Sequence, residues 1–283
     1  MDARTRVRQF LARGTADRPP FLVMATRYTA RLAQCDPADL LADPGLFVRS
    51  YTESVAVLGL DAILIEVPPA LASALIEVPP ALASALIEVP PALASAGGPA
   101  ASARAVLREN LHRLRATLRD QIAIVTLLPG PLTLAASLGV PATPDSLDDL
   151  VTALIGLQEY LGPVEFDALA LLERAAVADP EVPALADAAS AFWNVARYYS
   201  LPSLLIAAQA TPRLAAVGAT AVAAWSGAAA ADLLAAGATA AGQPPPSAPV
   251  PPPPGAFYLT PDELSPDQPV DAVRFLLRQL PRA

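Results

Sequence analysis

The stretch QIAIVTLL, residues Gln121–Leu128, decides the fold. It is a short apolar run rich in strand-favouring residues, and it lies between two amphipathic stretches, Ala101–Arg119 and Ser146–Tyr160. Pro129 follows at once, and proline ends a ladder because it has no backbone N–H to donate. A buried strand with a helix on either side in the sequence is typical of a parallel sheet covered by helices.

The same alternation recurs along the chain. It predicts further strands at Phe21–Ala25, Asp61–Val67, Phe166–Leu172, Ser203–Ala208, Ala219–Trp225 and Ala256–Thr260, with a weak strand near Gly237–Gly242. Further helices are predicted at Gly45–Leu58, Pro183–Tyr199 and Pro266–Leu280. Seven or eight such units in 283 residues favour a single (β/α)₈ TIM-type barrel over residues 1–283. No GxGxxG or GxxxxGK[ST] motif follows a strand, which argues against dinucleotide and nucleoside triphosphate binding.

Two segments depart from this pattern. The unit LIEVPPALASA occurs three times in tandem, starting at Leu64, Leu75 and Leu86. Only the first copy continues a strand, so residues 75–96 are predicted to form an insertion after the second strand. Residues 244–254 are almost all proline, which predicts a polyproline II linker before the last strand.

The amino-acid composition excludes several classes of partner and ligand. The net charge is -8 and all 19 basic residues are arginine, a balance that argues against a nucleic-acid partner. Cys35 and His112 are the only cysteine and histidine, so we predict no metal site and no cofactor. Met1–Arg13 is charged and lacks an apolar signal core, and Leu214–Gly242 is too rich in small residues to span a membrane. These features predict a cytoplasmic protein with no membrane partner. A homodimer stays open.

The ordered set of motifs resembles the uroporphyrinogen decarboxylase superfamily, which includes corrinoid-linked methyltransferases. The matching segments lie in the family's order over most of the chain: Thr5–Arg8, Asp17–Phe21, Val57–Ala62, Pro129–Leu134 and Phe257–Arg274. The resemblance implies a barrel with its active site at the carboxyl ends of the strands. It also implies a small-molecule substrate, with a tetrapyrrole as the first candidate.

The resemblance also suggests site residues. The family's Arg-Gln-Ala-Gly-Arg-Tyr run corresponds to Val23–Tyr28, so Arg27 and Tyr28 would bind substrate while Val23 replaces the first arginine. Glu66 would be the catalytic carboxylate, and Ser137 stands where the family has a substrate-binding tyrosine. Each has a structural alternative. Arg27 could form a rim ion pair, Tyr28 could be a packing residue at the rim, and Glu66 recurs in both later copies of the repeat.

Three functions therefore compete. The first is an enzyme, a lyase-like relative that acts on a carboxylated tetrapyrrole or a related small acid. The second is a non-catalytic binding protein or a decayed copy, suggested by the lost arginine and by the missing family histidine around Ala256–Thr260. The third is corrinoid-linked methyl transfer. Those enzymes use zinc to activate a thiol, and Cys35 and His112 do not match their ligand positions.

Overall fold

The structure is a computed structural model of the whole chain. It describes residues 1–13, 16–18, 20–24, 26–67, 72, 75–76, 99–162, 166–174, 177, 179–207, 214, 217–219, 221–224, 240–242 and 256–259. The polyproline segment 244–254, the predicted helix Pro266–Leu280 and most of the predicted insertion 75–96 lie outside these residues. Of that insertion, Leu75 and Ile76 are described, and both are buried.

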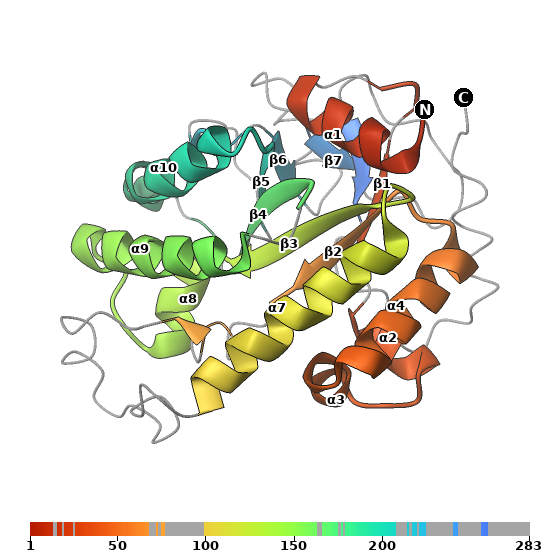
Figure 1. The fold of residues 1–283 in the computed structure, drawn as a ribbon. Coiled ribbons are helices and arrows are strands. Elements are labelled where there is room, and N and C mark those ends of the chain that lie inside the picture. The colour runs from red at the N-terminus through yellow and green to blue at the C-terminus, as the bar shows by residue number, and fades with distance from the viewer. Residues whose placement is uncertain are drawn as a thin grey trace.

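Eight parallel strands form one sheet (Figure 1). They are β1 (Phe21–Met24), β2 (Ala62–Glu66), β3 (Ala123–Pro129), β4 (Ala168–Glu173), β5 (Ser203–Ala207), β6 (Ala221–Ala224), β7 (Ala240–Gly242) and β8 (Ala256–Leu259). Their order is β6-β5-β4-β3-β2-β1-β8-β7, so β1 pairs with both β2 and β8. The two outermost strands, β6 and β7, contact each other. The predicted alternation of strands and helices is confirmed as an α/β fold with a parallel sheet.

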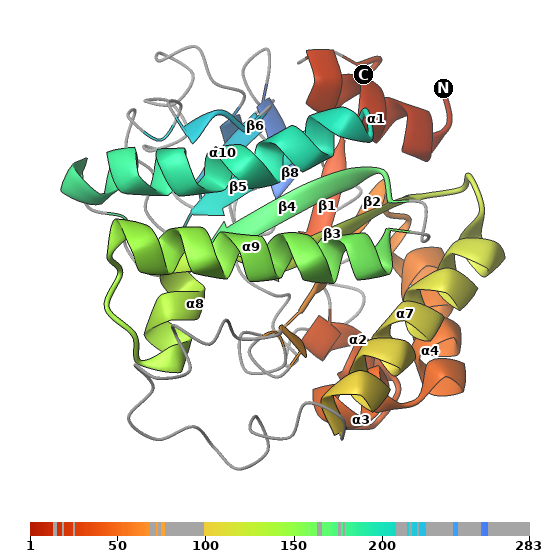
Figure 2. The same cartoon turned by 60° about the vertical axis from the view of Figure 1, so that its left-hand side comes forward.

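Helices cover the outer face of the sheet. The described helices are α1 (Ala3–Arg13), α2 (Thr26–Leu32), α3 (Pro37–Ala42), α4 (Pro44–Leu58), α7 (Pro99–Leu118), α8 (Pro131–Leu138), α9 (Pro144–Leu161) and α10 (Val182–Tyr198), with a 3₁₀ turn at Asp179–Glu181. Helix α4 packs beside α7, and α9 beside α10, as Figures 1 and 2 both show. None of these described helices is long and apolar enough to cross a membrane.

Local chemistry fixes where several helices start and stop. Asp43 accepts hydrogen bonds from the backbone N–H groups of Gly45 and Leu46, which opens α4. Gly59 ends that helix at φ 65°, a left-handed conformation that glycine adopts without a steric penalty. Thr143 and Ser146 form a reciprocal capping box at the start of α9.

The strands divide the core into two clusters. Side chains that alternate along β2–β5 point either inward or outward, because successive residues of a strand face opposite sides. The inward set packs in one cluster, which includes Ala62, Leu64, Val125, Leu172 and Ile206. The outward set packs against the helices in a second, larger cluster, which includes Ile63, Ile65, Ile124, Leu171 and Leu205. Both faces of the sheet are therefore buried, as parallel sheets require.

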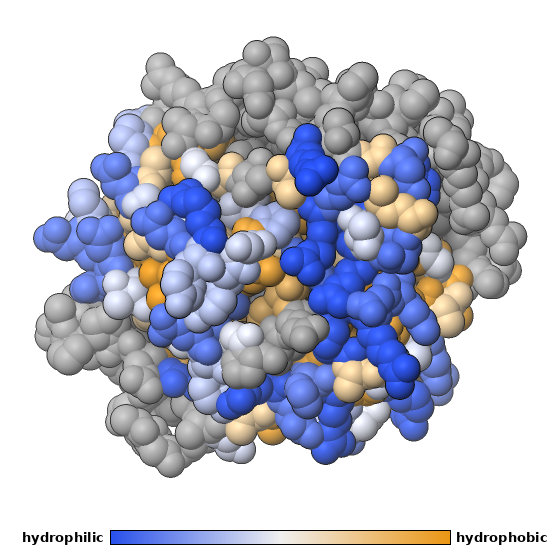
Figure 3. Space-filling model, turned by 45° about the horizontal axis from the view of Figure 1, so that its top comes forward, coloured by the Kyte–Doolittle hydropathy of each residue, from blue (hydrophilic) through white to orange (hydrophobic). Residues whose placement is uncertain are grey.

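Helix α1 closes the end at which the strands begin. Its Val7, Phe10 and Leu11 belong to the inward cluster together with side chains of β1–β5. Figure 3 tilts this end of the molecule partly toward the viewer and shows a band of hydrophilic side chains through the middle of the view, with apolar side chains among them. The apolar side of α1 thus packs against the inward face of the sheet, while its charged side contacts the residues that precede the strands.

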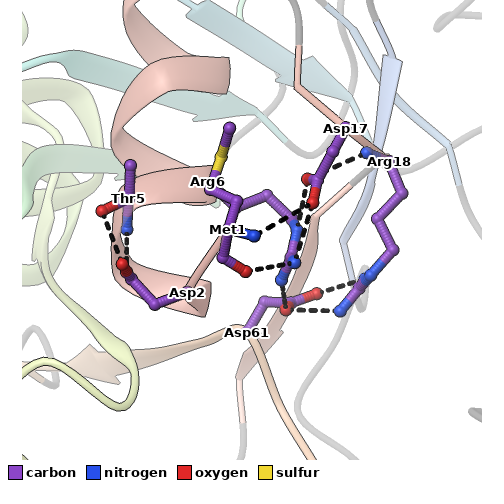
Figure 4. Close-up of polar contacts among 7 residues, drawn as sticks. All are labelled: Met1, Asp2, Thr5, Arg6, Asp17, Arg18 and Asp61. Atoms are coloured by element: carbon purple, nitrogen blue, oxygen red, sulfur yellow. Dashed lines mark hydrogen bonds and ion pairs between the residues drawn. The ribbon is translucent and has the colours of Figure 1, made fainter.

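Ion pairs that centre on the buried Asp61 hold α1 in place. Arg6 donates to Asp17 and to Asp61, each at 2.7 Å, and Arg18 reaches both oxygens of Asp61 at 2.6 and 2.7 Å (Figure 4). Hydrogen bonding to Arg6 lowers the pKa of Asp17 to about 2. Asp61 immediately precedes β2, so this network lies at the amino ends of the strands, the end that serves stability in barrels.

Candidate functional site

Polar side chains gather where β2, β3 and β4 end. Glu66 is the last residue of β2, and Glu173 is the last residue of β4, with Arg174 next to it. Between them β3 runs into Gly130 and the start of α8. Carboxyl ends of neighbouring parallel strands are the place where barrels bind ligands. We therefore take this group of residues as the candidate site.

An ion pair spans the site. The Arg174 guanidinium donates to both carboxylate oxygens of Glu66, at 2.8 and 2.7 Å from Nη2 and at 3.2 Å from Nε. The pair crosses the end of β3, because β2 and β4 are the two neighbours of that strand. The Glu66 side chain is 12% exposed and that of Arg174 is 36% exposed. Both charges are thus within reach of a molecule at this end of the sheet.

Glu173 faces the other way and is fully buried. One carboxylate oxygen accepts the backbone N–H of Leu132 at 3.0 Å, and the other accepts the backbone N–H and the hydroxyl of Thr133, at 2.8 and 2.7 Å. These backbone groups belong to the first turn of α8, where helical N–H groups have no partner within the helix. A carboxylate is favourable there because of the helix dipole. Glu173 therefore anchors α8 to the end of β4.

Gly130 makes room for this carboxylate. A Cβ at position 130 would lie 2.2 Å from an oxygen of Glu173 and 2.3 Å from its carboxyl carbon. The backbone of Gly130 has φ -69° and ψ 163°, angles that any residue can adopt. Glycine is needed here for the close approach of Glu173 and not for its conformational freedom.

Burial raises the pKa of Glu173 to about 7, against the lowering effect of its hydrogen bonds from Thr133 and Leu132. The unfolded chain would release this proton near its ordinary pKa of 4.5. Between these two values the folded state holds one more proton than the unfolded state. The stabilisation that Glu173 contributes to the folded state is therefore fully present below about pH 4.5, and it is lost as the pH rises through 7.

This linkage predicts how stability changes with pH. Lowering the pH from 8 to 5.5 should raise the free energy of unfolding by about 2 kcal/mol, the part of the shift from 4.5 to about 7 that falls within this interval. Chemical denaturation at a series of pH values would measure it. In Glu173→Gln the slope should disappear over this range, since glutamine does not titrate. An equal slope in both proteins would show that other groups cause the pH dependence.

The structure places the residues predicted from the sequence in different environments. Glu66 lies in the site and pairs with Arg174. Tyr28 is fully buried in the outward cluster, and Ser137 is exposed near the end of α8. Arg27 lies in α2, directly after β1, and its side chain is not among those described. The expected binding group of Arg27, Tyr28 and Ser137 stays a prediction.

Two members of the site were not identified from the sequence. Arg174 and Thr133 come from different strand–helix units, 41 residues apart, and the Arg174 backbone N–H donates to the Thr133 hydroxyl at 2.8 Å. The useful signal is positional. Arg174 lies two residues after the fourth apolar run, and Thr133 lies just after the Pro129-Gly130-Pro131 run that ends the third.

The described residues do not fit a zinc site. They hold no group of three or more His, Cys, Asp or Glu side chains placed to share a metal ion. His112 is exposed on α7, and Cys35 lies after α2 with its thiol directed at the carbonyl of Ala30, 3.6 Å away. Burial and the nearby Asp39 and Asp36 raise the pKa of this thiol, which disfavours the thiolate that binds metals.

Comparison with known proteins bears on the fold. No family model matches the chain, and no curated protein matches it. A methyltransferase from Methanosarcina mazei has a similar solved structure, with a TM-score of 0.70 over 99% of this chain and 98% of that one. The two chains share this fold. Their sequences are 15% identical, so the similarity extends to the architecture and leaves the chemistry to be argued from the site.

Proposed function

We propose that the chain forms a closed (β/α)₈ barrel of the uroporphyrinogen decarboxylase superfamily and takes part in corrinoid-linked methyl transfer. The observation that carries this proposal is the similarity to a methyltransferase over nearly the full length of both chains. The cyclic strand order and the contact between β6 and β7 support closure. The charged pair at the carboxyl ends of the strands supports a polar or ionic small-molecule substrate.

Methyl transfer is better supported than tetrapyrrole decarboxylation. Decarboxylation needs several arginines to hold the substrate carboxylates, together with an acidic group that steadies the developing charge. Val23 replaces one expected arginine, and Tyr28 packs in the outward cluster.

The proposed roles of the two charged residues follow from their contacts. Arg174 would orient the substrate through its planar array of donors, which suits carboxylate and phosphate groups. A substrate group that replaces Glu66 at Arg174 would leave the Glu66 carboxylate able to accept the proton of an incoming thiol. We derive no step through zinc, because the described residues do not supply its ligands.

The test is a methyl-transfer assay without added zinc. Purified protein is incubated anaerobically with methylcob(III)alamin and a series of small thiols, and the methylated thiol is measured by mass spectrometry. We expect protein-dependent methylation that a chelator does not abolish. Glu66→Gln should lower the rate roughly a hundredfold, within the range for loss of a general base.

A matched control variant shows whether the effect is specific to Glu66 or follows from removing any glutamate that pairs with an arginine. Glu109 also pairs with an arginine, Arg113, but on the exposed surface of α7. Glu109→Gln should therefore retain the wild-type rate. In parallel, uroporphyrinogen is offered as substrate. Stepwise loss of its carboxyl groups would replace the methyl-transfer proposal with decarboxylation, and no reaction of either kind by folded protein would favour binding without catalysis.

A further inference from the structure

We propose that Thr133 is a positioning residue of the site, which ties the backbone of Arg174 to the buried Glu173 and so holds the Glu66–Arg174 pair in place. This goes beyond the proposed function, because it names a residue that would orient the Glu66–Arg174 pair through hydrogen bonds and would not itself contact the substrate. It rests on that function only in taking the pair as the group that meets the substrate. The contacts themselves do not depend on which substrate binds.

The Thr133 hydroxyl connects two elements. It donates to a carboxylate oxygen of Glu173 at 2.7 Å and accepts the backbone N–H of Arg174 at 2.8 Å. A hydroxyl has one hydrogen, and an ionised carboxylate can only accept, so the direction of both bonds is fixed while Glu173 is charged. Thr133 is buried, so water does not readily replace either bond.

The position of these bonds along β4 gives them their effect. Glu173 is the last residue of β4 that pairs with β5, opposite Ala207. Arg174 is the first residue beyond that ladder, and its N–H finds its acceptor in Thr133. Because neighbouring residues of a strand point to opposite sides, fixing Glu173 toward α8 directs Arg174 toward Glu66.

A plain helix cap would look different. Capping of α8 needs only the backbone N–H groups of Leu132 and Thr133 and the carboxylate of Glu173. The bond from Arg174 to the Thr133 hydroxyl adds nothing to the cap. It couples the start of α8 to the residue that carries the exposed guanidinium.

The experiment compares Thr133→Val with Thr133→Ser. Valine keeps the shape and removes the hydroxyl, and serine keeps the hydroxyl. Two readouts are taken without substrate: hydrogen exchange at the Arg174 amide, and the rate at which phenylglyoxal modifies the Arg174 side chain, both by mass spectrometry. The modification of Arg113 in the same sample serves as the internal standard, and Glu66→Gln shows the rate of a released Arg174.

We expect Thr133→Val to speed exchange of the Arg174 amide about fivefold, the factor for loss of one hydrogen bond. Modification of Arg174 should rise toward the rate in Glu66→Gln, and Thr133→Ser should stay near wild type. If Thr133→Val lowers the melting temperature but leaves Arg174 modification unchanged, Thr133 is a helix cap and the proposal is overturned. Should Thr133→Val not fold, Thr133→Ala is measured against Thr133→Ser by the same two readouts.

Failure of the positioning role of Thr133 can be distinguished from failure of the proposed methyl transfer. If no methyl is transferred but Thr133→Val still releases Arg174, the positioning role stands and the reaction is wrong. If methyl is transferred and Thr133→Val leaves both Arg174 and the balance of kcat and KM unchanged, the function stands and the positioning role falls.

Discussion

Replacing Asp167 with alanine should lower the free energy of unfolding by about 3–5 kcal/mol, because it removes the buried carboxylate that pairs with the buried Arg115 and with Arg4. Asp167 is fully buried directly before β4. One of its oxygens accepts from Arg4 at 2.5 Å, and the other accepts from Arg115 and from the backbone N–H of Ile124 at 2.9 Å. The residue thus joins α1, α7 and β3 at the closed end of the sheet. Chemical denaturation would measure the loss.

Asp120 provides the matched control. It pairs with the same Arg4, but its side chain is 78% exposed. An exposed ion pair contributes little, so Asp120→Ala should cost less than about 1 kcal/mol. Equal losses in the two variants would mean that burial of the Asp167 contacts does not determine their contribution.

Replacing Gly130 with alanine should cost about 2–4 kcal/mol, since overpacking is combined with loss of hydrogen bonds to a buried carboxylate. The new methyl group would fall within 2.3 Å of the Glu173 carboxyl carbon, and that side chain is enclosed by the start of α8. The backbone angles allow alanine, so the loss reports only on packing. Thermal or chemical denaturation would show it.

Two further variants test this cause. Gly156, inside α9, has open space where a Cβ would go, so Gly156→Ala should stabilise the protein by up to about 1 kcal/mol. In the background of Glu173→Ala the clash at position 130 is removed. Gly130→Ala should then add almost no further loss, as expected for two residues in direct contact. Additive losses would contradict the proposed clash.

The fold could be predicted from the sequence because each strand is an apolar run bounded by its own helix signals. The run Gln121–Leu128 corresponds to β3, Ala123–Pro129, and the weak prediction near Gly237–Gly242 corresponds to β7, Ala240–Gly242. Burial on both faces makes the strands of a parallel sheet nearly continuous in hydrophobicity, so they are found even when their ends are one or two residues off.

The site could be predicted only in part. Glu66 was identified through the family resemblance, which implies a catalytic carboxylate there. Glu173 also ends a strand, but it is buried against α8. When the end of a strand is uncertain by one residue, the face of the sheet on which its last side chain lies cannot be predicted. A shift of one residue along a strand moves a side chain to the opposite face. Arg174 was missed for the same reason, and its partner Glu66 is 108 residues away, a separation on which sequence pattern carries no information.

The packing of α1 against the inward side chains has a kinetic consequence in the proposed barrel. Val7, Phe10 and Leu11 occupy the inward side near the amino ends of the strands. A small molecule would therefore enter and leave at the carboxyl ends of the strands. Because product and substrate would share that route, we expect each product to inhibit competitively against its own substrate.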